Sequence, residues 1–395
     1  MFNDNIVIVD AVRTPIGKFG GVLKNINSGF LATHVIEKII ERNFLDSDKV
    51  DEVILGEVRQ SSLSSNVARV AALRAGIPAS KPAFTVNRLC ASSMQAIASG
   101  VQQIQSGQAD IIIAGGTENM SQAPVYLREA RFSSSIPQVV DSNTENGQQP
   151  MEIYSDLLGM GITAENLAEK YNISRVEQDE FALSSQRKAE KALQNNIFNN
   201  EIVPIKIKEK KSSFIFSEDE HPRKDTSIEK LLKLKPVFKS QGSVTAGNSS
   251  GRNDGASALL IMSEKKAKEL NLIPLAKILD WTAVGVDPEY MGIGPVPAIK
   301  RLLQRTDKDI NQFGLVELNE AFAAQTLAVL REINIPEERL NVNGGAISLG
   351  HPLGMTGARI TTSLIHEMIR RKEKYGLATL CVGGGQGMAM ALELM

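Results

Sequence analysis

Short apolar and β-branched runs alternate with helix-like stretches near both ends of the chain. The first half carries predicted strands at Ile6–Val9, Glu52–Val58, Phe84–Val86 and Ile111–Ala114. The second half carries them at Ala276–Leu279, Leu315–Leu318, Leu340–Val342 and Ala378–Val382. Runs of this length with helical segments between them are typical of a βαβ succession. The pattern therefore predicts an α/β fold in each half.

The two sets of strands resemble each other in their order and in the dipeptides that end them. Paired in order, they keep a near-constant spacing of about 260 residues. Val86-Asn87 and Val342-Asn343 each end a strand before a Gly- or Ser-rich turn, and Gly115-Gly116 and Gly383-Gly384 each close the next strand. Any two α/β halves share some features, but the repeated dipeptides favour an internal duplication whose sheets and helices pack in layers.

Between the halves, from about Ser121 to Ser243, the alternation stops and the sequence is more polar. One helix is predicted to start at a capping box, Ser174 with Glu177. We expect an N-terminal half of residues 1–120 and 244–270, an inserted loop domain of residues 121–243, and a C-terminal half of residues 271–395. The segment from Lys206 to Lys239 has 10 basic and 6 acidic residues. This surplus of positive charge indicates either a solvated surface or a binding site for a phosphorylated small molecule.

Composition narrows the class of protein. The 395 residues are 42% hydrophobic and 23% charged, as in an ordinary globular enzyme, and the net charge of -1 argues against nucleic acid as a partner. Two cysteines make no disulfide framework, and no stretch approaches the ~20 apolar residues of a membrane span. With no basic leader before its first apolar run, the chain is expected to be cytoplasmic and not membrane-bound.

Both cysteines follow predicted strands. Cys90 lies at the first turn of a helix predicted from Ala91 to Gln105, where free N–H groups and the helix dipole would lower a thiol pKa. A buried cysteine is more often a small hydrophobe, so position alone does not establish reactivity. Cys381 runs into Gly383 and further glycines, but Met388 stands where a dinucleotide fingerprint needs its third glycine.

His351 and Asn319 also lie where strands turn into helices. His351 is in a glycine-crowded loop before a helix that begins near Met355, and Asn319 directly follows a strand. Strand ends from both halves are expected to meet in one crevice, which would gather two thiols, an imidazole and an amide. The other three histidines have ordinary surroundings, and no HExxH or paired CxxC pattern supports a metal site.

Five blocks resemble the signatures of thiolases, in the family's order along the whole chain. They are Asn87-Arg88-Leu89-Cys90-Ala91-Ser92-Ser93-Met94-Gln95, Gly247-Asn248-Ser249-Ser250-Gly251, Asn319-Glu320-Ala321-Phe322, Gly350-His351-Pro352 and Cys381-Val382-Gly383-Gly384-Gly385. The resemblance implies a five-layered α-β-α-β-α fold of two similar halves plus a loop domain that clasps coenzyme A. No prosthetic group is implied, because coenzyme A and acetyl-CoA are substrates.

The resemblance also implies roles for individual residues. Cys90 would carry the acyl group as a thioester, His351 would deprotonate it, and Cys381 would be the second acid/base. Asn319, through a water, and His351 would hold an enolate oxygen, and the amides of Cys90 and Gly383 would form a second oxyanion hole. Residues implied at the coenzyme A tunnel or the acyl pocket are Arg223, Ser250, Phe238, Met160, Met291 and Phe322.

Three positions depart from the acetoacetyl-CoA-specific pattern. Ala91 adds a methyl group beside the thiol, Ser93 resembles the fatty-acid-degrading branch, and Gly159 stands where those members have a histidine. Loss of that histidine enlarges the pocket or leaves the thioester less tightly held. Gly242 to Asn248 and Val286-Asp287-Pro288 resemble the acetyltransferase side, so chain-length preference stays open.

We therefore expect an acetyl-CoA C-acyltransferase that catalyses reversible Claisen condensation of two acetyl-CoA to acetoacetyl-CoA. The alternatives are a degradative 3-ketoacyl-CoA thiolase, a decarboxylating synthase, and a non-catalytic CoA- or lipid-binding relative. Asn319 occupies the place of a synthase's second histidine, and no thiol or imidazole is missing. The family resemblance also implies a homodimer or homotetramer.

Overall fold

Ten strands form one continuous sheet system to which each half of the chain contributes a separate group. The computed structural model describes residues 5–132, 136–155, 157–208 and 212–395. In spatial order the first group is β1 (Ile6–Arg13), β10 (Asn253–Ser263), β5 (Ile111–Asn119), β3 (Glu52–Gly56) and β4 (Ala83–Val86), with the short β2 (Gly17–Lys18) on β10. The second is β11 (Ala276–Gly285), β14 (Gln386–Leu394), β13 (Tyr375–Val382) and β12 (Leu315–Leu318).

The two groups repeat one topology, which agrees with the predicted duplication. In each group the strand that comes first in the sequence lies beside the one that comes last. The groups are joined where Val7 of β1 pairs with Lys277 of β11. On the free side of β12, Leu340 makes a single parallel bridge to Val316, in the place that β4 takes beside β3.

The structure corrects the strand prediction in three respects. Strands β10 and β14 were not predicted, and both pair antiparallel with their neighbours, so the sheet is mixed rather than a plain βαβ succession. Residues 340–342 form no strand, because Asn341 has a left-handed φ of +42°. Strand β5 continues to Asn119, so Gly115-Gly116 lies inside it rather than at its end.

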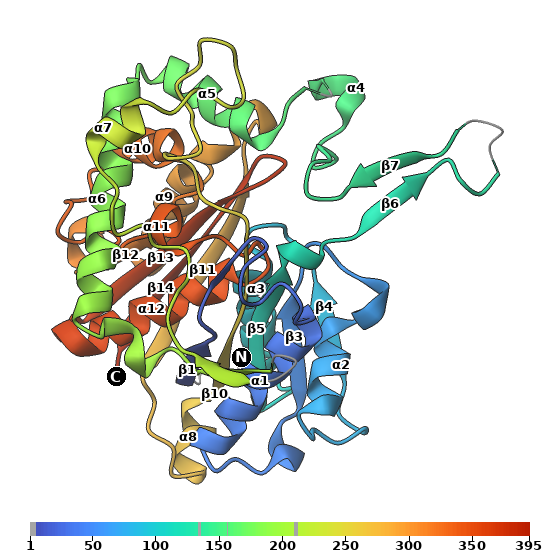
Figure 1. The fold of residues 1–395 in the computed structure, drawn as a ribbon. Helices are drawn as coiled ribbons and strands as arrows, with labels where there is room; N and C mark the ends of the chain where they lie inside the picture. The colour runs from blue at the N-terminus through green and yellow to red at the C-terminus, as the bar shows by residue number, and fades with distance from the viewer. Residues whose placement is uncertain (1–4, 133–135, 156, 209–211) are drawn as a thin grey trace.

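Five layers follow from which helices cover which strand face. Helices α1 (Ser28–Arg42) and α2 (Val67–Arg74) pack on the outer face of the first group, and α9 (Pro295–Thr306) and α10 (Ala323–Glu332) on that of the second. Figure 1 shows α3 (Ser92–Gln105) and α12 (Thr356–Arg371) between the two groups. Ile112 faces this central layer and Ile113 the outer one, so the strands are buried on both faces.

Residues between β5 and β10 form the predicted insertion-like region. Strands β6 (Val125–Arg128) and β7 (Gln138–Asp141) pair in a hairpin that extends from the body of the molecule (Figure 1). The region also holds α4 (Met151–Tyr154), α5 (Met160–Lys170), α6 (Arg175–Gln194), the β8 (Ile205–Lys208) and β9 (Ser213–Phe216) pair, and α7 (Ile228–Leu232). The predicted capping box of Ser174 and Glu177 starts α6.

The remaining regular elements are short. They are α8 (Glu264–Glu269), α11 (Ala346–Leu349), and the 3₁₀ turns η1 (Ser47–Lys49), η2 (Ser62–Ser64), η3 (Met120–Gln122), η4 (Ile197–Asn200), η5 (Pro288–Ile293) and η6 (Ile310–Gln312). Within the described residues, no helix is long and apolar enough to cross a membrane.

Candidate active site

Cys90 lies in a tight turn between β4 and α3. Leu89, the preceding residue, has φ of +45°, a conformation that costs a non-glycine residue on the order of 1 kcal/mol. Two side chains hold it. Asn87 Oδ1 accepts a hydrogen bond from the Leu89 N–H at 2.9 Å. Ser92 Oγ accepts one from the Arg88 N–H at 2.9 Å and donates one to the Leu89 carbonyl at 2.7 Å. The strained turn therefore fixes the position of the thiol.

The first turns of the two central helices meet beside this cysteine. Ser93 Oγ accepts a hydrogen bond from the Ala358 N–H at 2.8 Å. A Cβ on Gly357 would come within 2.6 Å of Met94 N, so the close approach requires glycine there. Because α12 follows directly on the loop of His351, this contact brings the histidine of the second half toward the cysteine of the first.

The tautomer of His351 follows from its hydrogen bonds. Thr356 Oγ1 donates its single hydrogen to the Pro352 carbonyl at 2.7 Å. His351 Nδ1 lies 2.6 Å from the same hydroxyl oxygen, so Nδ1 must carry the proton and donate. The lone pair is therefore on Nε2. Burial, with a smaller effect from the positive charge of Arg359, lowers the pKa of His351 to about 3, so at neutral pH the ring is an uncharged base.

Glu118 ties the loop of His351 to the end of β3. One carboxylate oxygen accepts hydrogen bonds from the N–H groups of Val58 at 3.0 Å and Gly354 at 2.8 Å. The other accepts one from the N–H of Arg59 at 2.9 Å. A buried carboxylate satisfied by three backbone donors holds both loops in one arrangement.

Asn319 reaches the same place from the second half. It directly follows β12, is buried, and its Nδ2 lies 3.5 Å from His351 Nε2. Its Oδ1 is buried and has no hydrogen-bond partner among the described residues. Asn341 holds the strand end in position, because its side-chain amide bonds to both the N–H and the carbonyl of Leu318 at 2.8 Å. An unsatisfied amide oxygen at this point is suited to holding a water.

The two thiols are neighbours with different exposure. Cys90 is half-buried and Cys381, on β13, is fully buried in a cluster with Met160 and Met291. Burial raises the pKa of Cys381, and the nearby charge of Cys90 raises it further. The Cys381 thiol therefore stays protonated in the resting protein.

The prediction that the helix N-terminus gives Cys90 a low pKa is wrong in its net direction. Burial is the largest effect and raises the pKa of the Cys90 thiol. Hydrogen bonds from the N–H groups of Gly383 and of Cys90 itself oppose this rise but do not overcome it. The thiol therefore needs a base to become a nucleophile, and the two N–H groups already point at its sulfur.

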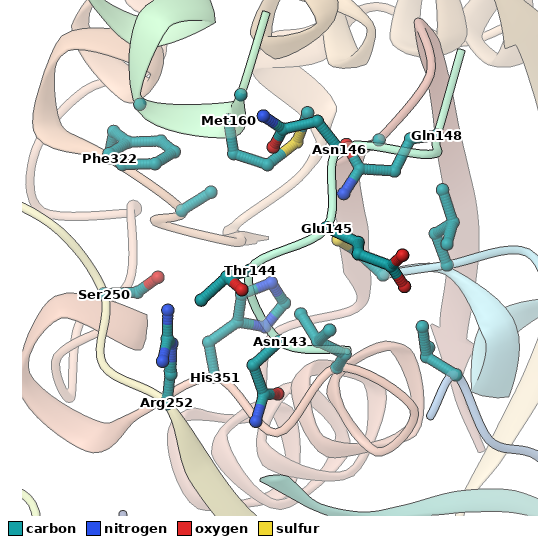
Figure 2. A pocket seen from close by; sticks show the side chains of 18 of the residues that line it. Asn143, Thr144, Glu145, Asn146, Gln148, Met160, Ser250, Arg252, Phe322 and His351 are labelled. Atoms are coloured by element: carbon teal, nitrogen blue, oxygen red, sulfur yellow. The ribbon is translucent and has the colours of Figure 1, made fainter. Parts of the chain in front are cut away.

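A cavity of about 490 Å³ contains most of the residues that the sequence singled out. Its lining includes Cys90, His351, Gly383, Ser250, Phe238, Met160, Met291 and Phe322. The rings of Phe238 and Phe322 meet edge to face, with centroids 6.1 Å apart. Figure 2 shows Met160, Ser250, Phe322 and His351 around one space. Asn319 and Cys381 lie behind this lining rather than in it.

Arg223 lies outside this cavity. It is exposed, its backbone N–H donates to Gln186 Oε1 at 2.9 Å, and it lines two neighbouring cavities with His221. Arg252 lines the main cavity instead, close to Ser250 (Figure 2). A signal for this arginine was present in the sequence, since Arg252 directly follows the Gly247 to Gly251 block.

The structure shows the surroundings of the three residues that depart from the acetoacetyl-CoA-specific pattern. Ala91 is fully buried in the central core and does not line the cavity, so its methyl group does not narrow it. Gly159 does line the cavity, and Asn146 Oδ1 lies 3.0 Å from where a Cβ on Gly159 would be. Part of the space left by the missing side chain is therefore filled by Asn146, which sequence reasoning did not identify. Ser93 serves the helix contact described above.

Comparisons with known proteins agree with this architecture. The family described as "Thiolase, N-terminal domain" matches residues 6–265, and "Thiolase, C-terminal domain" matches residues 272–394. These matches and the layered fold define the class as an acyltransferase with a mixed α/β core. Within that class, the chain belongs to the thiolase family.

Three relatives show the extent of the similarity. A probable acetyl-CoA acyltransferase of Staphylococcus epidermidis is 49% identical over 389 residues, which cover 98% of both chains. The crystal structure of the Bacillus anthracis acetyl-CoA acetyltransferase is 48% identical, with a TM-score of 0.94 and 99% of both chains covered. That of human mitochondrial 3-ketoacyl-CoA thiolase in complex with CoA is 43% identical, with a TM-score of 0.94 over 99% of this chain and 98% of that one.

Proposed function

We propose that this protein is an acetyl-CoA C-acyltransferase that carries the acyl group on Cys90 and acts most readily on acetoacetyl-CoA. One observation carries the proposal. A thiol held by a strained turn shares a cavity with a neutral imidazole whose lone pair is on Nε2. A protonated thiol beside a neutral base is the pair that generates a thiolate when substrate is bound.

In thiolysis, His351 Nε2 takes the proton of Cys90, and the sulfur attacks the 3-oxo carbon of the substrate. The bond between C2 and C3 breaks, the acyl group stays on Cys90, and the enolate of acetyl-CoA takes the proton of Cys381. Free CoA then gives its thiol proton to Cys381 and attacks the thioester. Cys90 leaves and recovers its proton from His351. Condensation is the reverse sequence.

Two sites stabilise the oxyanions of these steps. The N–H groups of Cys90 and Gly383, which converge on the Cys90 sulfur in the free protein, hold the oxygen of the thioester tetrahedral intermediate. Asn319, through a water, and His351, once protonated, hold the enolate oxygen. Asn319 Nδ2 and His351 Nε2 are 3.5 Å apart, so both side chains can contact the same bound oxygen. Asn319 Oδ1 has no hydrogen-bond partner among the described residues and can hold the water.

Coenzyme A is proposed to enter beside Ser250 and Arg252. A guanidinium at the mouth of the cavity suits a phosphorylated ligand, and the facing Phe238 and Phe322 rings give the pantetheine arm an apolar passage. The human relative solved with CoA shares the fold over nearly the whole chain. Arg223, in the adjoining cavities, would reach only the outer part of the nucleotide.

The test is intact-protein mass measurement after incubation with acetyl-CoA. One acetyl group should appear on the wild type and none on Cys90→Ala. The matched control is Cys381→Ala, which should still be acetylated, although more slowly because Cys381 no longer protonates the leaving CoA. It should lose condensation by at least about a hundredfold, since it lacks the second acid/base. An unmodified wild type, or an adduct that persists in Cys90→Ala, contradicts the proposal.

The second candidate function is a degradative 3-ketoacyl-CoA thiolase, which differs from the first in the acyl chain length of its substrate. Gly159 favours it, because part of the cavity wall at this point is formed by Asn146 and not by a side chain of residue 159. Thiolysis rates against 3-oxoacyl-CoA of increasing length separate the two. A steep fall beyond four carbons supports acetoacetyl-CoA, and a flat profile supports the degradative enzyme.

A further inference from the structure

The cavity has a polar wall on the side away from the proposed coenzyme A entrance. Residues 143–146 and Gln148, between β7 and α4, supply much of it. In Figure 2, Glu145 and Gln148 lie on the opposite side of His351 from Ser250 and Arg252. A plain alkyl chain gains nothing from such a wall, because covering polar groups with apolar surface costs free energy.

Arg59 adds a cation to this wall. It lies in the loop after β3, and the Val58 carbonyl of this loop accepts a hydrogen bond from Asn87 Nδ2 of the Cys90 turn at 3.3 Å. Arg59 therefore belongs to the Cys90 side of the cavity. The positive charge of Arg59 would therefore act on the acyl group bound at Cys90 and not on the nucleotide end of coenzyme A.

Three polar atoms of this wall are buried and have no hydrogen-bond partner among the described residues. They are Arg59 Nε, Asn143 Oδ1 and Gln148 Oε1. A buried polar group without a partner destabilises the protein, because its hydration is lost and not replaced. Asn143 Nδ2 donates to the Met120 carbonyl at 3.0 Å, so its unsatisfied atom is the acceptor Oδ1. No such bond holds the side-chain amide of Gln148 within the described residues, and it can turn to present an N–H donor. Arg59 and Gln148 therefore point to a ligand that accepts hydrogen bonds.

Nearby carboxylates make no hydrogen bond to the Arg59 guanidinium, although its charge partly offsets the rise that burial causes in the pKa of Glu118. Both oxygens of Glu118 accept backbone N–H groups, as described above. Glu145 pairs with Arg128 at 2.9 Å. No ion pair or side-chain hydrogen bond of Arg59 occurs within residues 5–132, 136–155, 157–208 and 212–395. The planar guanidinium, which matches a carboxylate with two parallel hydrogen bonds, is therefore available to a ligand.

We propose that Arg59, with the side-chain amide of Gln148, binds a carboxylate at the far end of the acyl chain. The substrate class is then 3-oxoacyl-CoA whose acyl chain ends in a carboxylate. This inference rests on the proposed function and narrows its substrate. The acyl carboxylate supplies the missing partner of Arg59 and accepts a hydrogen bond from the Gln148 amide at the same time.

The experiment compares thiolysis of two substrates of equal chain length, 3-oxohexanoyl-CoA and the same chain with a terminal carboxylate, 3-oxohexanedioyl-CoA. For the wild type, kcat/KM should be at least about tenfold higher for the carboxylated substrate, because an analogue that leaves buried polar groups unpaired is rejected. Arg59→Met should reduce that ratio to about one or below, and Arg59→Lys should give an intermediate ratio.

Two further variants separate recognition from folding. Gln148→Leu should lower the ratio without removing the cation, and Arg74→Met, which removes an arginine stacked on Phe30 outside the cavity, should leave the ratio unchanged. A wild type that prefers the uncharged substrate, or an Arg59→Met protein that loses both activities equally, overturns the inference. Thiolysis of acetoacetyl-CoA by the wild type in the same assay distinguishes this outcome from failure of the proposed function.

Discussion

The depressed pKa of His351 makes a quantitative prediction about stability. The ring is buried, Thr356 accepts its Nδ1 proton, and Arg359 places a positive charge nearby. Its pKa is about 3 in the folded protein against 6.5 for the free side chain. Between these values the unfolded chain binds a proton that the folded protein does not, so the contribution to stability is complete above pH 6.5 and is lost as the pH falls toward 3.

The size of the effect follows from the same two values. At pH 5 the unfolded imidazole is about 1.5 pH units below its pKa, and the folded imidazole stays neutral. Each unit is worth 1.36 kcal/mol, so the wild type should lose about 2 kcal/mol between pH 8 and pH 5 through this one residue. His351→Gln should not show that loss, since glutamine does not titrate.

The assay is urea unfolding of the wild type and His351→Gln at pH 8 and pH 5, at one protein concentration. The quantity compared is the pH-dependent change in the free energy of unfolding, and contributions common to both proteins cancel. Cys90→Ser is the control, because the raised pKa of Cys90 keeps that thiol protonated across this range. It should retain the pH dependence of the wild type.

Equal pH dependence in the wild type and His351→Gln would refute the reasoning. A direct check comes from imidazole NMR signals, because the chain has only 4 histidines and the signals lost in His351→Gln identify this ring. They should not shift between pH 8 and pH 5. A titration near 6.5 would mean that the ring is solvated or paired with an acid.

Three other substitutions test individual contacts. Thr356→Val leaves the Nδ1 proton of His351 without an acceptor and should lower kcat by about tenfold or more, while Thr356→Ser restores it, as steady-state kinetics would show. Gly384→Ala puts a side chain at φ +74° with its Cβ 2.4 Å from a backbone carbonyl and should cost about 1–3 kcal/mol in thermal unfolding, whereas Gly147→Ala, where nothing lies within 4 Å, should be neutral. Arg13→Met should cost about 3–5 kcal/mol, because it leaves two buried carboxylates unpaired, and an unchanged midpoint in denaturant would contradict this.

The sequence predicted the strands whose apolar runs are unambiguous and missed those whose local preferences are not. The strand at residues 253–263 opens with Asn-Asp-Gly, which is typical of turns, and that at residues 386–394 is rich in Ala and Met, which favour helices. Both form because a neighbouring strand supplies a ladder on each side. Residues 340–342 make only the single backbone bridge to Val316, because the left-handed φ of Asn341 turns the chain away and its side chain makes the next bonds to β12.

The motifs located the cavity better than they described its surroundings. Cys90, His351 and Gly383 line it as expected, because each block includes the glycine or polar residue that shapes its own loop. Arg59 and Asn146 were not identified, since their approach to Cys90 depends on contacts across the fold and no local pattern marks it. Burial, which reverses the expected pKa of Cys90, is likewise a property of packing. The expected oligomer and the cytoplasmic location stay predictions.

The close contact of α3 and α12 at Gly357 bears on how such a molecule could arise. Each repeat contributes one side of the central layer and one part of the chemical apparatus, with the thiol of Cys90 from the first and the imidazole of His351 from the second. A single ancestral repeat could bring a thiol and an imidazole together only by forming a dimer with a second copy of itself, and that dimer would dissociate on dilution. Joining the repeats in one polypeptide makes that encounter permanent and frees each copy to specialise.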